Sequence, residues 1–183
     1  TYKTISYQNR SKFDFEEFTK FISFLQESYP AVHEQLELEK VNDYALIYKW
    51  IGSDSTKKPI GLTSHYDVVP VLEGTEANWE QDPFSGAVVN DKIWGRGTLD
   101  DKIGVIGILQ GVEYVLNEGF KPSRDMYFMF GYDEEIGGGA GRGDANLEAL
   151  EIGNRFYRRR LLLLHRQHDS GEAAELDHRR RET

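Results

Sequence analysis

Three short stretches of the chain combine histidine and carboxylate side chains in patterns that could support metal chemistry. The first ends in His65 and Asp67, directly after an apolar run. Residues i and i+2 of a strand point to the same face, so this imidazole and carboxylate should lie side by side just past the end of a strand. A carboxylate beside a metal-binding imidazole fixes the orientation and basicity of the ring. Asp67 is therefore expected either to hold His65 or to orient another group of the same site.

Two pairs of adjacent acids form the other stretches. Asp100 and Asp101 stand at the predicted start of a helix, where acids also act as caps and offset the helix dipole. Glu134 and Glu135 follow a predicted buried strand, where neighbouring carboxylates repel each other unless cations neutralise them. A histidine together with several of these acids provides the nitrogen and oxygen ligands of a typical metal site. With two glutamates, one can bind the metal while the other serves as the general base.

The elements that must position these residues alternate between helix and strand patterns. We expect a first helix from a Ser11 cap through Phe13 to Leu25, and a second from Asp100 to a Gly119 cap. Predicted strands span 44–51, 59–64 and 125–130, with a hairpin over 87–94. The near-continuous apolar character of 59–64 suits a sheet covered on both faces. In such α/β folds, sites lie beyond the carboxyl ends of the strands, where His65 and Glu134-Glu135 are expected.

Composition narrows the chemistry further. The chain of 183 residues is long enough for one domain with a real core, and its net charge of -9 argues against a nucleic-acid surface. It has no cysteine, so any metal site must use histidine and carboxylates. We find no apolar run long enough for a transmembrane helix and no signal peptide. The chain begins at Thr1, so localisation is unknown from this sequence.

The composition changes at about Gly138. Residues 1–138 contain ten Lys and three Arg, whereas residues 139–183 contain nine Arg and no Lys. We therefore divide the chain into the N-terminal part of a catalytic domain, 1–138, and an Arg-rich atypical tail, 139–183. Loss of periodicity in this tail fits either disorder or a shifted reading frame.

Four motifs resemble the dinuclear zinc aminoacylase and carboxypeptidase family, which includes carnosinases, Gly-Xaa vacuolar carboxypeptidases and N-acyl-amino-acid synthase/hydrolases. They are SHYDVVP at 64–70, WEQDPFSG at 79–86, WGRGTLDDK at 94–102 and DEEIGG at 133–138. Their order and separations also resemble those of the family. The resemblance covers about residues 13–138 and implies an α/β zinc-peptidase domain with a mostly parallel central sheet, here incomplete.

The resemblance also implies a role for each residue. His65 would bind the first of two zinc ions, Asp100 would bridge both, and Glu135 would bind the second. Glu134 would be the general base, and Asp67 would hold His65 or tune the zinc. The implied reaction is hydrolysis of an amide bond in a peptide or N-acyl amino acid. The family also includes homodimers, but we expect no counterpart of their dimerisation domain in these 183 residues.

The chain departs from the family pattern after the fourth motif. About 24 to 28 residues past Glu135, where the family has a further acidic ligand, the chain has Arg159, Arg160 and three leucines. Tail residues that could substitute are His165, His168 and Asp169. We therefore expect fewer or more weakly bound zinc ions and an inactive chain. The alternatives are a non-catalytic binding or dimerising relic of the same fold, and a small hydrolase that uses the tail ligands.

Overall fold

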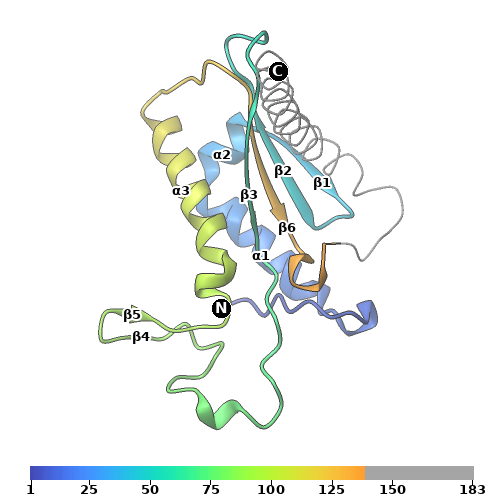
Figure 1. Cartoon of the computed structure of the whole chain (residues 1–183). Coiled ribbons are helices and arrows are strands. Elements are labelled where there is room, and N and C mark those ends of the chain that lie inside the picture. The colour runs from blue at the N-terminus through green and yellow to red at the C-terminus, as the bar shows by residue number, and fades with distance from the viewer. Residues whose placement is uncertain (139–183) are drawn as a thin grey trace, which may run out of the picture. The chain divides into compact units, whose positions relative to one another are not determined.

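A computed structural model describes residues 1–138, in which three helices cover one face of a four-stranded sheet (Figure 1). The predicted tail, 139–183, lies outside the described residues. The helices are α1 (Phe15–Ser28), α2 (Pro30–Gln35) and α3 (Ile103–Asn117). The strands of the sheet are β1 (Glu37–Val41), β2 (Ala45–Trp50), β3 (Ile60–His65) and β6 (Met126–Gly131). The short strands β4 (Val88–Val89) and β5 (Lys92–Ile93) form a separate hairpin.

The strand order is β1-β2-β6-β3, and only the β3–β6 pairing of this sheet is parallel. The α/β class predicted from the sequence is confirmed, but the sheet is mixed rather than mostly parallel. The reason lies in the connections. A short turn joins β1 to β2 and requires antiparallel pairing, whereas α3 lies in the long crossover that a parallel β3–β6 pair needs.

The core lies between the helices and the inner face of the sheet. Helix α1 buries Phe18, Phe21, Ile22 and Leu25, as the sequence spacing predicts. Alternate residues of the central strands face this layer, in agreement with the two-residue period of a strand; they are Leu46, Tyr48, Trp50, Phe128 and Phe130. The aromatic and aliphatic packing fixes the two central strands against the helices, and thereby fixes where those strands end.

Two boundaries differ from the prediction. Helix α1 begins at Phe15 with Asp14 at its N-cap position, while Ser11 lies in a preceding 3-10 turn and bonds to Asn9. Helix α3 begins at Ile103 rather than at the acids, since Asp100 and Asp101 have non-helical backbone angles. The predicted hairpin is confirmed. Its turn residues Asn90 and Asp91 both have positive φ, as a tight two-residue hairpin turn requires.

Strand β3 is less buried than its apolar sequence predicts. Its first four residues are exposed, because β3 is the edge strand of the described sheet and β6 is its one neighbour there. Only Ser64 and His65, at the carboxyl end, are buried. Within the described residues, no helix has the length and apolar character needed to cross a membrane.

Candidate metal centre

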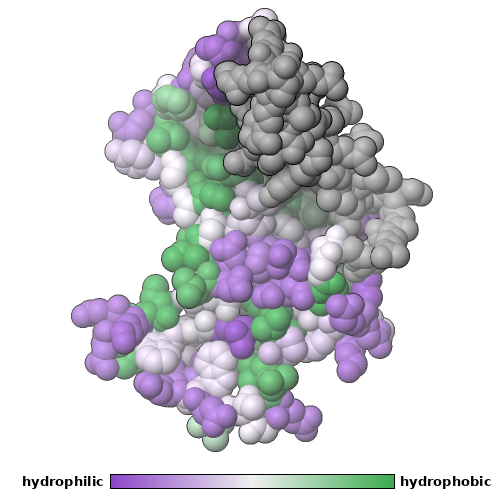
Figure 2. Space-filling view, in the orientation of Figure 1, coloured by the Kyte–Doolittle hydropathy of each residue, from purple (hydrophilic) through white to green (hydrophobic). Residues whose placement is uncertain are grey.

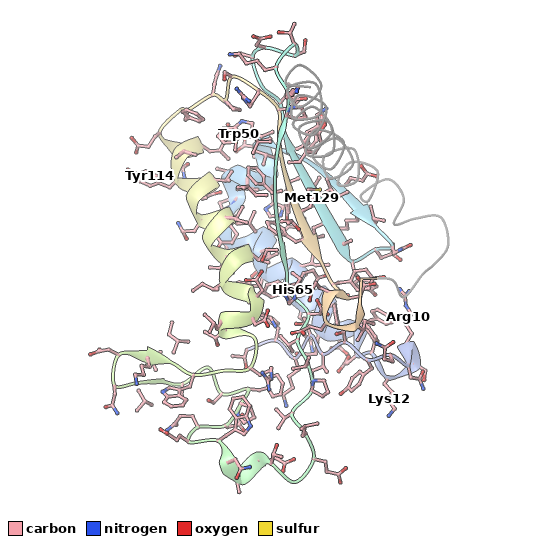
Figure 3. The ribbon with its side chains drawn as sticks, in the orientation of Figure 1. Arg10, Lys12, Trp50, His65, Tyr114 and Met129 are labelled. Carbon is pink, nitrogen blue, oxygen red and sulfur yellow. The ribbon has the colours of Figure 1, made fainter. Side chains whose placement is uncertain are left out.

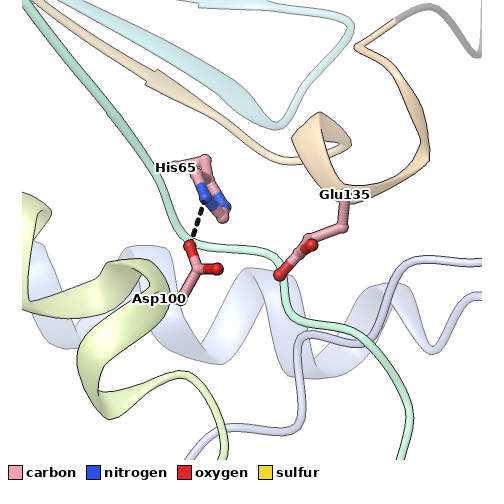
Figure 4. Close-up of side chains that lie close together, drawn as sticks. All are labelled: His65, Asp100 and Glu135. Carbon is pink, nitrogen blue, oxygen red and sulfur yellow. Dashed lines mark hydrogen bonds and ion pairs between the residues drawn. The ribbon is translucent and has the colours of Figure 1, made fainter.

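Three separate segments bring His65, Asp100 and Glu135 together. His65 is the last residue of β3, Asp100 lies in the turn before α3, and Glu135 lies in the 3-10 turn after β6. The parallel pairing places His65 opposite Gly131, so β3 and β6 end at the same edge of the sheet. One potential ligand atom from each of the three side chains lies within 4.8 Å of the others. Figure 3 shows where His65 lies at the end of β3, and Figure 4 shows the three side chains together. Figure 2 shows hydrophilic residues gathered over this end of the two strands.

Asp67 lies beneath this group and is fully buried. Its carboxylate accepts hydrogen bonds from the backbone N–H groups of Glu134 and Glu135, each at 3.1 Å, and from Ser6 Oγ at 2.7 Å. The same carboxylate lies 3.2 Å from His65 Nδ1. Asp67 therefore fixes the histidine and the glutamate turn relative to each other, which confirms the predicted contact with His65.

The two nitrogens of the His65 ring face different partners. Nδ1 faces the Asp67 carboxylate and the Asp67 backbone carbonyl, at 3.2 and 3.3 Å, both of which accept hydrogen bonds. With Nδ1 held by Asp67, Nε2 is the ring atom that faces the other carboxylates and the atom that would bind a metal. Nε2 lies 3.1 Å from Asp100 Oδ1 and 3.6 Å from Glu134 Oε2 (Figure 4 shows the Asp100 contact).

The electrostatics of the group favour a cation. Burial lowers the pKa of His65, but the carboxylates of Asp67, Glu134, Asp100 and Asp101 raise it, and the net pKa is raised. Burial raises the pKa of the Glu135 carboxyl, and the Asp100 carboxylate raises it further. An imidazole that retains its proton and a carboxyl that resists ionisation are both expected where negative charge gathers without a metal. A divalent ion would displace the proton and reverse both effects.

The donor atoms fit a divalent metal ion with hard or borderline character. One imidazole nitrogen and two carboxylate oxygens suit zinc and its neighbours in the first transition series. Residues 1–138 contain no other group of three such side chains within ligand distance of one another. The side chains of Asp100 and Glu134 are 77% and 63% exposed, so a ligand can reach the group from solvent.

The structure thus brings together the five residues to which the resemblance gives a role. It also adds contacts that no local pattern indicates. Ser6 reaches Asp67 from the N-terminal segment, which runs beside Val68. Asp101, considered as a helix cap, instead accepts a hydrogen bond from Ser64, and α3 has no side-chain cap. His165, His168 and Asp169 lie outside the described residues.

Comparison with known proteins agrees with this geometry. Residues 61–165 match the family described as Peptidase family M20/M25/M40. The chain belongs to this family. A relative named probable carboxypeptidase S-like 2, from Dictyostelium discoideum, is 47% identical over 157 residues, which are 84% of this chain and 30% of the relative.

Two further relatives extend the comparison. The N-fatty-acyl-amino acid synthase/hydrolase PM20D1 of Xenopus tropicalis is 42% identical over 124 residues, 67% of this chain and 24% of that protein. The crystal structure of human carnosine dipeptidase 1 superposes with a TM-score of 0.62 at 21% identity, over 85% of this chain and 34% of that one. This likeness supports the fold alone. The chain spans less than a third of the length of the two curated relatives.

Proposed function

We propose that residues 1–138 form the metal-binding part of a zinc-dependent metallopeptidase of the carboxypeptidase or aminoacylase type. The substrate of the complete enzyme would be a peptide or an N-acyl amino acid, hydrolysed at an amide bond. Family membership and the names of the relatives support this reaction class. The single observation that carries the proposal is the convergence of His65, Asp100 and Glu135 from three segments onto one point.

His65, Asp100 and Glu135 would hold the metal. When bound, such an ion polarises the substrate carbonyl and makes water more acidic. Asp100 is the candidate for a bridge between two zinc ions, because its side chain lies beside His65 and is open to solvent. A complete second site needs ligands beyond those that residues 1–138 bring together, so we propose at most partial metal loading of this chain.

Glu134 would act as the general base. Its side chain is exposed and reaches within 3.6 Å of His65 Nε2, so it can accept a proton from a water molecule at the edge of the site. Asp67 holds the backbone N–H groups of both glutamates, which keeps the two side chains on one rigid turn. In this arrangement the Glu135 carboxylate would bind the metal, and the Glu134 carboxylate would accept the proton from water.

The two glutamates provide a sharp test. In the 183-residue chain, Glu135→Gln should weaken zinc binding at least about tenfold, because a ligand is lost, whereas Glu134→Gln should retain most of the affinity. The measurement is competition with a chromophoric chelator, with the exposed Glu118→Gln as the matched control. Equal zinc affinity in all three variants would refute the assigned site.

A second candidate function is a non-catalytic binding or dimerising module of the same fold. The exposed edge of β3, with Ile60 40% and Leu62 41% exposed, favours this alternative because a free apolar edge can pair with another chain. It predicts a soluble, defined complex that forms with or without zinc. A zinc-dependent hydrolysis of N-acyl amino acids by the purified chain would exclude it.

A further inference from the structure

Residues next to two of the candidate ligands form a second link between the same two segments. Ser64 precedes His65 on β3, and Asp101 follows Asp100 in the turn before α3. Ser64 Oγ donates a hydrogen bond to Asp101 Oδ2 at 2.6 Å and lies 3.2 Å from the Asp101 backbone carbonyl. Ser64 is 9% exposed, so the bond is largely shielded from water. The two segments therefore meet through two parallel pairs, His65 with Asp100 and Ser64 with Asp101.

The two pairs differ in what a metal would change. A bound ion would compete for the His65 Nε2 and Asp100 atoms that now face each other at 3.1 Å. The Ser64–Asp101 bond involves neither of these atoms and can persist with or without the ion. It also holds the Asp101 carboxylate, which is not one of the three groups within ligand distance of one another.

Gly104, in the first turn of α3, leaves the space that this bond occupies. A Cβ atom at this position would lie 2.5 Å from Ser64 Oγ and 2.8 and 3.0 Å from the two carboxylate oxygens of Asp101. These separations are too short for non-bonded atoms, so any larger side chain would displace the serine, the aspartate or the helix. The glycine thus lets α3 begin directly against the Ser64–Asp101 pair.

We propose that Ser64, Asp101 and Gly104 are positioning residues that set the distance between His65 and Asp100 before a metal binds. This inference rests on the proposed metal site and adds residues that make no contact with the ion. Outer partners that orient metal ligands commonly change metal affinity by about 10- to 100-fold when removed. Their effect should appear in zinc affinity more strongly than in the stability of the metal-free chain.

The experiment measures zinc affinity of the 183-residue chain by chelator competition, together with the thermal unfolding midpoint of each metal-free variant. Ser64→Ala and Asp101→Ala should each weaken zinc binding about tenfold or more. Asp101→Asn keeps an acceptor oxygen for Ser64 and should restore most of the affinity. Gly104→Ala should weaken binding as well, although alanine favours a helix over glycine. Thr63→Ala, an exposed neighbour on the same strand, is the matched control.

The outcomes separate this inference from the proposed function. If the unmodified chain binds no zinc, the proposed metal site itself is refuted. If the unmodified chain binds zinc and Ser64→Ala, Asp101→Ala and Gly104→Ala bind it equally well, the positioning role is overturned. A lower unfolding midpoint with unchanged zinc affinity would also overturn it, since that is the signature of a purely structural bond. Should Asp101→Ala not fold, Ser64→Ala and Gly104→Ala decide the question.

Discussion

At the scale of single residues, the carboxylates of the site are accompanied by a half-buried lysine, Lys102, which senses the charge of Asp67. The Nζ atom of Lys102 is buried and has no hydrogen-bond partner among the described residues. It lies over the Phe21 ring, 5.7 Å from the centroid. Burial lowers the pKa of this ammonium to about 8, although the Asp67 carboxylate acts in the opposite direction. At pH 7 the folded chain still holds most of this proton, but burial makes the charged form less favourable than it is in the unfolded chain.

This pKa gives a sign for the pH dependence of stability. An unfolded lysine holds its proton up to a pH of about 10.4, so between pH 8 and that value the unfolded chain binds more protons at Lys102 than the folded chain. The contribution of Lys102 to the free energy of unfolding, and so to stability, therefore rises with pH across this window. We expect Lys102→Met to stabilise the metal-free chain at pH 7 by about 1–3 kcal/mol, since one pKa unit corresponds to about 1.4 kcal/mol.

The measurement is urea unfolding of the parent chain and of Lys102→Met at pH 7 and at pH 9.5. The difference in stability between the two proteins should shrink at the higher pH. The exposed Lys58→Met is the control and should show no such change. A Lys102→Met variant that is less stable than the parent at pH 7 would show that the ammonium has a favourable partner.

At the scale of elements, α3 carries the Asp100 turn and is fixed by its buried face. Leu109 is fully buried in the core, whereas Ile103 on the same helix is 56% exposed. We expect Leu109→Ala to lower the free energy of unfolding by about 2–5 kcal/mol, and Ile103→Ala to change it by less than about 0.5 kcal/mol. Chemical denaturation of both variants checks this contrast. Comparable losses would mean that the outer face of α3 is also packed.

The elements also show how far the sequence could predict the structure. The strands that end at His65 and before Glu134 follow local hydrophobic patterns, so their type and their functional ends were predictable. The Ser6–Asp67 bond joins residues 61 positions apart, and nothing in the local sequence indicates it. Similarly, the start of α1 at Phe15 rather than after Ser11 depends on a 3-10 turn. The mixed character of the sheet depends on which strands pair and in which direction. The residue types within one strand do not show whether its neighbour runs parallel or antiparallel.

At the scale of the whole molecule, apolar surface lies along β3 and the outer side of α3 (Figure 2). Ile60 and Leu62 on β3 and Ile103 and Tyr114 on α3 are all at least 40% exposed. The apolar run at 59–64 predicted a strand covered on both faces, whereas these residues leave part of the strand exposed. An exposed apolar edge strand is a recognised template for pairing between chains.

We therefore expect the purified chain to self-associate through β3. Leu62→Lys places a charge on the free edge and should shift the protein towards the monomer in sedimentation velocity experiments. Leu72→Lys, at a loop position that is 72% exposed, is the matched control and should leave association unchanged. A parent chain that is monomeric at high concentration would show that the edge is covered in solution.

The number of zinc ions bound per chain, measured by elemental analysis after equilibrium dialysis, decides whether the three residues form a metal site. We expect at most one equivalent, removable by a chelator, and none bound by His65→Ala. The double variant His165→Ala, His168→Ala should bind as much zinc as the parent. Two tightly held equivalents, or full retention of zinc by His65→Ala, would contradict the assignment of the site to His65, Asp100 and Glu135.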